Sequence, residues 1–325
     1  MVRRAFLLPP CRRKGYSMCD SWQYYLIKMT SRLISLLPYH VVLYLGSLLG
    51  PLYYRVAARQ RRRAIAQIQE CLHISPLEAE NIIRNLFVNL SRTFLEVLYM
   101  PSLTPSNIQK LVTIENRHYL EEALVKGKGV IALSSHIGNW EWLGAALAMN
   151  GFPVASVTKP QPNKQHTRLL NEYRQRAGIA SFSRDNSEVI GAAKALKQGR
   201  VLGFFIDQDG GPGGVFTPFL GKMSSTPQGA AAFARKFKSP IVPLFIVRRP
   251  DGGHRIIVRP YFYYEDTGHE ERDMYNLTLK MNSIVEDIIR TYPDEWLWFQ
   301  KRWNTPFENH HESIPRMAGE AIEKN

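Results

Sequence analysis

The chain has 325 residues, of which 45% are hydrophobic, and 42 Lys and Arg against 28 Asp and Glu give it a formal net charge of +14. This composition excludes a disordered or fibrous protein, and the length suffices for one large α/β domain with a full hydrophobic core. The positive charge indicates an anionic partner, such as a nucleic acid, a membrane surface or an acidic ligand.

The three cysteines, Cys11, Cys19 and Cys71, are odd in number and have no CxxC spacing. They predict neither a disulfide framework nor a zinc site, which favours a reducing compartment. Residues 1–21 are expected to be a disordered extension. Their apolar stretch "AFLLPPC" is too short and too interrupted by proline for a signal peptide, and Met18 is an alternative start.

Residues 33–54 contain no Lys, Arg, Asp or Glu, and 22 such residues can span a bilayer. Pro38 and Pro51 interrupt the stretch, so a helix that lies in the interface is equally open. Residues 55–63 then carry five arginines, which attract anionic lipid at roughly 1 kcal/mol per charge and favour the cytoplasmic side. We therefore expect a membrane-associated or transmembrane segment at 33–54, with a buried helical hairpin as the alternative.

Residues 22–100 are expected to be helical. Ser75 as N-cap, Pro76 at the first helical position and Glu78 two residues later predict a capped helix start. Apolar residues then recur at helical spacing up to the loop "PSLTP" at 101–105.

After this loop, short apolar runs alternate with amphipathic segments. The expected strands are 128–135, 152–159, 179–184, 200–207, 240–249 and 254–264. The expected helices are 139–151, 162–178, 187–199, 225–238 and 272–293. This alternation predicts an α/β fold with a mostly parallel sheet flanked by helices, and the tight turn "PDGG" makes the last two strands an antiparallel edge. We expect one domain over 22–305 and a polar tail over 306–325.

The stretch "SSHIGNWEWLG" at 134–144 contains the chemically most informative residues. His136 follows a strand, and Glu141 falls in the first turn of the next helix, at the sheet edge where open α/β folds bind ligands. Gly138 opens the corner, so Glu141 can fold back onto the imidazole. A carboxylate on one ring nitrogen leaves the other nitrogen free to act as a base.

The nucleophile is expected to come from the substrate. The chain has no GxSxG motif, so the histidine would activate a substrate hydroxyl for direct attack on an activated carbonyl. Two alternatives stay open: a buried structural histidine, and a metal ligand, although no HExxH motif supports the latter. The "DQD" of 207–209 similarly suggests either a metal-binding DxD or a loop cap with a solvated second carboxylate.

The HxxxxE corner resembles the HxxxxD motif of the glycerolipid acyltransferase superfamily. The similarity to the bacterial late acyltransferases of lipid A biosynthesis, of the lauroyl or myristoyl type, extends over residues 22–305. It is carried by "RRRAIAQIQECL", "NLFVNLSRTFLE", "KPQPNKQHTRLLNEYRQRAG", "SRDNSEVIGAAKALKQGRVLGFFIDQD", "VFTPFLGKMSSTPQGAAAFARKFKSPIVPLFI" and "YPDEWLWFQKRW".

This resemblance implies an enzyme that transfers a fatty acyl group to a hydroxyl of a lipid A precursor or a related glycolipid. The donor would be acyl carrier protein or acyl-coenzyme A, without a further cofactor or metal, and the work would be done at the cytoplasmic face of the inner membrane. His136 becomes the general base and Glu141 its orienting carboxylate. The expected substrate-binding residues are Asn163, Arg174, Arg184, Asp207 and Asp209.

Members of the family differ in which carboxylate contacts the histidine. The later loop "GGPGGVFTPF" at 210–219 offers none, which favours Glu141 or, failing it, Asp207 or Asp209. The positive charge suits both an acidic carrier protein and a phosphorylated lipid. A nucleic-acid partner is not expected, because no helix-turn-helix, RRM or KH pattern occurs. We expect a monomer. Two alternatives stay open: an acyltransferase of the same mechanism that acts on another lipid acceptor, and a catalytically silent membrane-binding relative.

Overall fold

The computed structural model describes residues 21–159, 161–183 and 186–307. The expected disordered extension, apart from Ser21, and the alternative start at Met18 lie outside these residues, as does the polar tail after residue 307. Ser21 itself begins the first helix.

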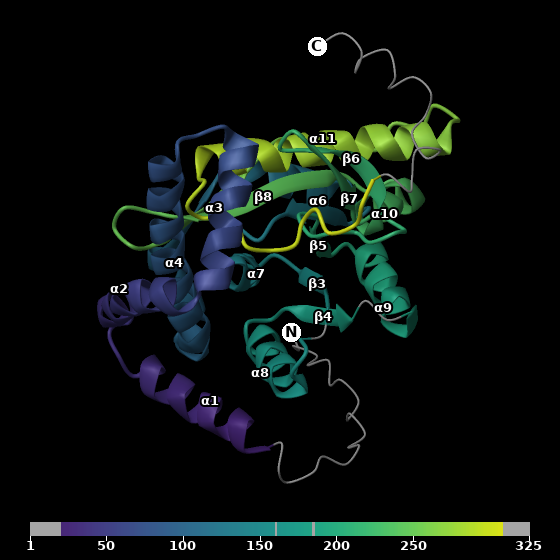
Figure 1. Cartoon of the computed structure of the whole chain (residues 1–325). Coiled ribbons are helices and arrows are strands. Elements are labelled where there is room, and N and C mark those ends of the chain that lie inside the picture. The colour runs from purple at the N-terminus through teal and green to yellow at the C-terminus, as the bar shows by residue number, and fades with distance from the viewer. Residues whose placement is uncertain (1–20, 160, 184–185, 308–325) are drawn as a thin grey trace, which may run out of the picture.

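Four helices form one side of the molecule (Figure 1). They are α1 (Ser21–Ser35), α2 (Tyr39–Val56), α3 (Ala58–Leu72) and α4 (Pro76–Tyr99), which confirms the helical prediction for this part of the chain. The α4 start is the predicted one. The Ser75 side chain accepts a hydrogen bond from the backbone N–H of Glu78, and the Glu78 side chain accepts one from the N–H of Ser75.

The apolar run at 33–54 is divided between two helices, because α1 ends at Ser35 and α2 begins after Pro38. Among the described helices, none alone is long and apolar enough to cross a bilayer, and only α2 with α3, bent by 90°, passes that test as a pair. Gly46 and Gly50 let α2 pack closely on α4, because a Cβ at either position would lie within 2.7 Å of a Cα atom of α4.

The central sheet has seven strands in the order β1-β9-β8-β2-β5-β3-β4. The strands are β1 (Val112–Glu115), β2 (Val130–Ser134), β3 (Val154–Thr158), β4 (Ala180–Ser183), β5 (Val201–Phe205), β8 (Ile241–Arg248) and β9 (His254–Val258). All neighbours are parallel except β8 and β9. The mostly parallel sheet and its antiparallel pair are therefore confirmed.

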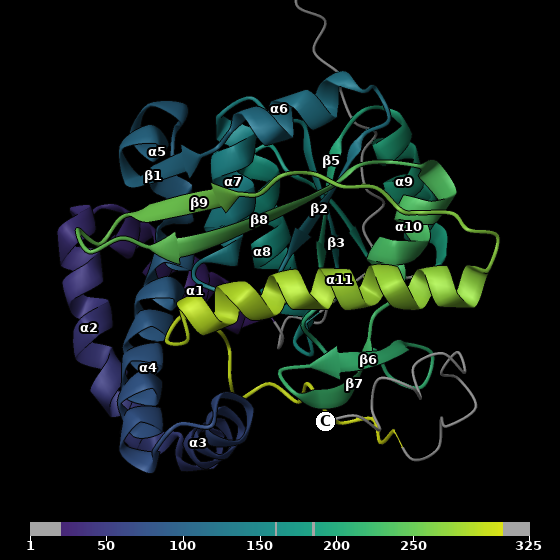
Figure 2. The same ribbon diagram turned by 90° about the horizontal axis from the view of Figure 1, so that it is seen from above.

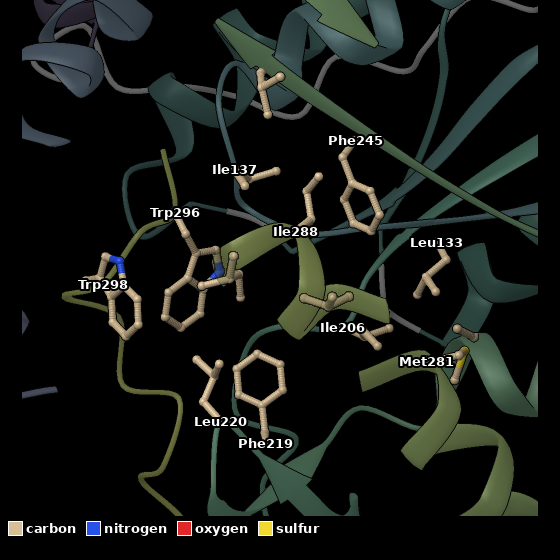
Figure 3. Close-up of a cluster of buried hydrophobic side chains, with 14 of the residues drawn as sticks. Leu133, Ile137, Ile206, Phe219, Leu220, Phe245, Met281, Ile288, Trp296 and Trp298 are labelled. Carbon is tan, nitrogen blue, oxygen red and sulfur yellow. The ribbon is translucent and has the colours of Figure 1, made fainter. Parts of the chain in front are cut away.

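Helices cover both faces of this sheet (Figure 2). They are α5 (Pro105–Leu111), α6 (His118–Val125), α7 (Trp140–Met149), α8 (Lys164–Arg176), α9 (Asn186–Lys197), α10 (Gly229–Phe237) and α11 (Glu270–Thr291). Side chains alternate across each strand. In β2, Ile131 and Leu133 join the core shared with α10 and α11, whereas Val130 and Ala132 join the core shared with α6 and α7. Figure 3 shows part of the first core, with Leu133 and Phe245 from neighbouring strands.

The fold differs from the prediction in three respects. β1 pairs with β9, so the antiparallel pair lies one strand in from the edge rather than at it. In addition, β6 (Val215–Phe219) and β7 (Lys222–Thr226) form a separate hairpin where a loop was expected. Helices α5 and α6, which precede β2, were not predicted either. β1 has four residues and both β1 and β6 are partly exposed, so their apolar patterns are too short and too mixed to predict strands.

Candidate active site

His136 and Asp207 lie together at the carboxyl edge of the sheet. Each residue comes two positions after a strand, His136 after β2 and Asp207 after β5. These strands are parallel neighbours, and their last residues, Ser134 and Phe205, stand opposite each other. This register therefore places His136 and Asp207 next to each other at the carboxyl edge of the sheet.

Asp207 holds His136 through two hydrogen bonds. Its Oδ1 lies 2.9 Å from Nδ1 of the ring, and its Oδ2 accepts from the His136 backbone N–H at 2.8 Å. Asp207 is fully buried, whereas the His136 side chain is 17% exposed. A carboxylate at Nδ1 favours the tautomer with the proton on Nδ1, which leaves Nε2 as the basic nitrogen. Nε2 has no hydrogen-bond partner among the described residues.

The electrostatics of this pair follow from its burial. Burial lowers the pKa of His136, but the charge and hydrogen bond of Asp207, with a further contribution from Glu141, outweigh it and raise the pKa above 6.5. Burial raises the pKa of Asp207, but His136 and its hydrogen bonds outweigh it and lower the pKa to about 2. The pair is thus an ionised carboxylate beside a strengthened base.

Glu141 does not contact the imidazole in this structure, so the expected hydrogen bond between the two is corrected. Its carboxylate instead pairs with Arg174 of α8, with Nε–Oε2 at 2.8 Å and Nη2–Oε1 at 2.5 Å. The physical reason is that the guanidinium fork matches a carboxylate in two places, and α7 directs Glu141 toward α8. The alternative orienting residue considered from the sequence, Asp207, makes the contact.

Gly138 forms the corner between these groups. Its φ of +58° favours glycine, and a Cβ there would lie 2.2 Å from the carbonyl oxygen of Ile246. Asn139 then caps α7, because its side chain accepts from the backbone N–H of Trp142 at 3.0 Å. The tight corner and the cap together fix where the chain turns from His136 into the helix.

The other predicted substrate-binding residues do not all converge. Asn163 caps α8 and donates to Gln23 at 2.9 Å, and it lines neither of the cavities described below. Asp209 accepts from the Thr305 hydroxyl at 2.8 Å, so the two carboxylates of "DQD" bind different partners. Arg184 lies outside the described residues.

A first cavity of about 740 Å³ has His136, Glu141 and Arg174 in its lining. This volume lies within the range of small-molecule sites. Lys159, Gln161 and Gln208 add further polar groups to the lining. Apolar side chains of α7 and the sheet region line the rest of it and include Leu143, Leu147, Val154, Ile179, Val201 and Leu244. A substrate with a polar reacting group and an apolar tail would match this division.

A second cavity of about 770 Å³ lies between α1, α2, α4 and α8. Its lining is mainly apolar and includes Leu49, Leu52, Val56, Phe94, Leu169 and Leu170. Trp140, Glu141 and Gln161 line both cavities. The two cavities therefore share part of their lining beside the His136 corner.

A second buried histidine–carboxylate pair lies behind this corner. Glu96 of α4 is fully buried and contacts Nε2 of His254 at 3.0 Å. The same carboxylate accepts from Arg248 at 2.6 Å, from Tyr39 at 2.7 Å and from Asn139 at 2.9 Å. Sequence reasoning missed this cluster, because its members are far apart in the chain and no local pattern joins them.

Comparison with known proteins gives a consistent family assignment. The family described as bacterial lipid A biosynthesis acyltransferase matches residues 10–305. The lipid A biosynthesis palmitoleoyltransferase of Escherichia coli K12 is 26% identical over 273 residues, which cover 83% of this chain and 87% of that protein. The E. coli lauroyltransferase is 25% identical over 277 residues, with 84% and 88% covered. The phosphatidylinositol mannoside acyltransferase of Mycolicibacterium smegmatis is 24% identical over 230 residues, with 69% and 73% covered.

The family match spans most of the sequence and includes the corner that holds His136, the β5 end that holds Asp207, and both cavities. On these grounds the chain belongs to the bacterial lipid A biosynthesis acyltransferase family, and it is an O-acyltransferase.

Proposed function

We propose that this enzyme transfers a fatty acyl group from a carrier thioester to a hydroxyl of a lipid A precursor or a related glycolipid, with His136 as the general base. The observation that carries the proposal is the His136–Asp207 pair, with Nδ1 bound to the carboxylate and the ring in the wall of a cavity that continues into apolar side chains.

In the proposed reaction, Nε2 of His136 removes the proton of the acceptor hydroxyl while its oxygen attacks the thioester carbonyl. The C–O bond forms, the C–S bond breaks, and the proton passes from the imidazolium to the departing sulfur. Asp207 stays ionised throughout and stabilises the imidazolium between these two proton transfers. No covalent acyl-enzyme is needed.

Arg174 and Glu141 are proposed to act on substrate as a neutralised pair rather than as separate charges. They are held bidentate and both line the first cavity next to His136. Nη1 of Arg174 donates a long hydrogen bond of 3.3 Å to Oδ1 of Asn171. An anionic group of the substrate, such as a phosphate, could take this N–H in place of Asn171. Asn163, Asp209 and Arg184 remain sequence predictions for substrate binding.

Membrane association is proposed from the outer side of α1 and α2. Their exposed apolar side chains form what we call the apolar surface: Trp22, Tyr25, Leu26, Met29, Leu33, Tyr44, Leu45, Leu48, Leu49, Leu52 and Val56. Large exposed apolar patches are typical of membrane or protein contacts. The arginines of 55–63 follow directly and would bind anionic headgroups at a cytoplasmic membrane face. Four of the residues that line the second cavity, Leu49, Leu52, Val56 and Phe94, are themselves exposed, so lipid chains could enter there from the bilayer.

This membrane contact has a direct test. Leu45→Glu and Leu48→Glu should weaken binding of the full-length protein to vesicles that contain anionic lipid, as measured by flotation. Val125→Glu, a change at an exposed site on α6, is the matched control and should bind as the wild type does. Equal binding by all three variants would contradict the assignment of the apolar surface.

The donor and acceptor are proposed from charge. A formal charge of +14 would attract both acidic acyl carrier protein and a phosphorylated glycolipid. A second acceptor class, another membrane glycolipid, is favoured by the similarity to the mannoside acyltransferase.

The experiment incubates detergent-solubilised full-length protein with labelled acyl carrier protein thioesters and a lipid A precursor, in parallel with acyl-coenzyme A. The wild type should label the precursor, and His136→Ala should reduce the rate by about 10²–10⁴, the usual contribution of a positioned base. A loss below tenfold would remove His136 from the mechanism. Label on other membrane lipids instead of the precursor would change the acceptor class.

A further inference from the structure

A segment near the end of the described chain runs along the catalytic corner. Residues 293–300, which we call the strap, follow α11. Ile137 and Trp296 form an antiparallel bridge, the Gly138 N–H donates to the Glu295 carbonyl at 3.1 Å, and the Leu297 N–H donates to the His136 carbonyl at 3.2 Å. Figure 3 shows Trp296 of the strap near Ile137 and Trp298 next to Trp296.

The strap also contacts the carboxylate that holds the base. The indole N–H of Trp296 donates to Oδ2 of Asp207 at 2.8 Å, and the amide of Gln300 donates to the same oxygen at 3.3 Å. The His136 backbone N–H is the third donor to Oδ2, at 2.8 Å. Three donors on Oδ2 leave Oδ1 for the imidazole ring, so the carboxylate has one fixed orientation.

We propose that Trp296 is a positioning residue that holds Asp207 ionised and oriented toward His136. This inference rests on the proposed role of His136 as the base. An indole nitrogen can donate a hydrogen bond but cannot accept one, so it favours the ionised carboxylate over the protonated one. Asp207 is fully buried and needs such donors, because a buried carboxylate without partners would take up a proton.

Trp296 is well placed for this role because its ring has little freedom. It is fully buried, packs edge-on against Trp298 with ring centres 4.7 Å apart, and contacts Phe219 with centres 5.9 Å apart. It lines neither of the two cavities. Its effect on the reaction must therefore pass through Asp207 rather than through substrate contact.

The chain provides a matched control in Trp298. This residue is equally buried and sits two positions away in the same strap, but its indole N–H donates to the carbonyl of Pro293 at 2.7 Å. Trp296→Phe and Trp298→Phe each remove one buried indole ring and one indole hydrogen bond. Loss of packing affects both variants, and loss of the Asp207 contact affects only the first.

The experiment compares full-length wild type, W296F and W298F in the acyl-transfer assay across pH. W296F should lower kcat about tenfold, the lower end of what loss of a hydrogen bond to a charged group costs, while KM stays unchanged. The acidic limb of its pH profile should move to higher pH, because Asp207 with fewer donors attracts the imidazole proton more strongly. W298F should keep the wild-type limb. A W296F limb that coincides with those of wild type and W298F would overturn the proposal.

A second variant guards against misfolding. Gln300→Met removes the weaker donor from a partly exposed position and should move the limb in the same direction by less. The imidazole pKa of His136, followed by NMR of histidine-labelled protein and assigned from the His136→Ala spectrum, gives a readout without turnover. If the wild type transfers no acyl group, the proposed function fails; if that pKa is the same in W296F and W298F, the Trp296 inference fails.

Discussion

Two fully buried carboxylates in this protein contact a histidine ring at nearly the same distance. Asp207 lies 2.9 Å from Nδ1 of His136, and Glu96 lies 3.0 Å from Nε2 of His254. Their consequences for the two rings are opposite. The pKa of His136 is raised, whereas burial, which Glu96 only partly offsets, lowers the pKa of His254.

The difference comes from the cation beside Glu96. Arg248 pairs with both oxygens of that carboxylate through Nη1 and Nη2, and its charge also acts on His254 to lower the pKa further. The hydrogen bonds to Oδ2 of Asp207 come from neutral donors. The buried Arg302 acts on Asp207 through its charge but donates its hydrogen bonds to Gln208, Ser225 and Thr226, so no cation is paired with this carboxylate as Arg248 is with Glu96. In addition, His136 lines a cavity and His254 is fully buried. A histidine–carboxylate contact is therefore a catalytic pair only where the negative charge is not already neutralised and one ring nitrogen can meet a substrate.

Asp207→Asn should have the largest effect on the reaction. The amide keeps the shape of the side chain but removes the charge that stabilises the imidazolium, so the transfer rate should fall by about 10²–10⁴. The acidic limb of the profile should also move to lower pH, because burial alone lowers the pKa of His136. Steady-state rates across pH measure both effects. A variant with more than a tenth of the wild-type rate would show that Asp207 does not assist the base.

Glu96→Gln should act on stability instead. Removing the charge leaves Arg248 buried without its carboxylate, and breaking such a buried pair costs about 3–5 kcal/mol in unfolding free energy. Denaturant unfolding measures this loss. Transfer by the folded fraction should stay within severalfold of the wild type, since the Glu96 side chain contacts Asn139 at the corner and not His136 or Asp207. A large loss of rate in a stable Glu96→Gln protein would contradict the structural role.

The two histidines should also give stability opposite pH dependence. Because the pKa of His136 is raised in the folded state, the stability that its protonation gives is fully present below about pH 6.5. It is lost as the pH rises through the higher folded-state pKa. Because the pKa of His254 is lowered in the folded state, the stability that its neutral ring gives is present above about pH 6.5. It is lost as the pH falls toward and through the lower folded-state pKa. This opposite pH dependence is tested by measuring the free energy of unfolding between about pH 5 and 8. The proteins compared are the wild type, His136→Ala and His254→Ala. Parallel curves for the two variants would contradict the contrast.

Glu141→Gln should have the smallest effect on the reaction. It frees Arg174 from its ion pair and removes a minor charge contribution to His136, so a severalfold loss of rate is expected with the acidic limb slightly lowered. Arg174→Gln, which removes the other partner, is the matched variant. A loss in Glu141→Gln as large as that in Asp207→Asn would restore Glu141 as the orienting carboxylate.

The fold was largely predictable from local patterns. The strand at 128–135 and the helix capped by Asn139 have clear periodicity and end signals, and both form where expected. The order of the strands was not predictable, because β1 joins the sheet through β9, which is more than a hundred residues away in sequence. Four residues with alternating exposure carry too little information for that pairing.

The site was predictable only in part, because several of its contacts join residues that are far apart in the sequence. His136 stands out because it follows a strand at the ligand-binding edge. Its partner Asp207 depends on β2 and β5 being neighbours, which is a property of the whole sheet. Glu141 is closer in sequence, but Arg174 from another helix competes for its carboxylate. The Trp296 and Gln300 contacts with Asp207 depend on how the strap crosses the corner.

The central claim is that His136 and Asp207 act as one unit in acyl transfer, and a double-mutant cycle tests it most directly. Transfer rates are measured for wild type, His136→Ala, Asp207→Asn and the double variant. If the carboxylate acts through the base, the double variant should be no slower than His136→Ala alone. If the two losses multiply, the residues act independently and the account is wrong.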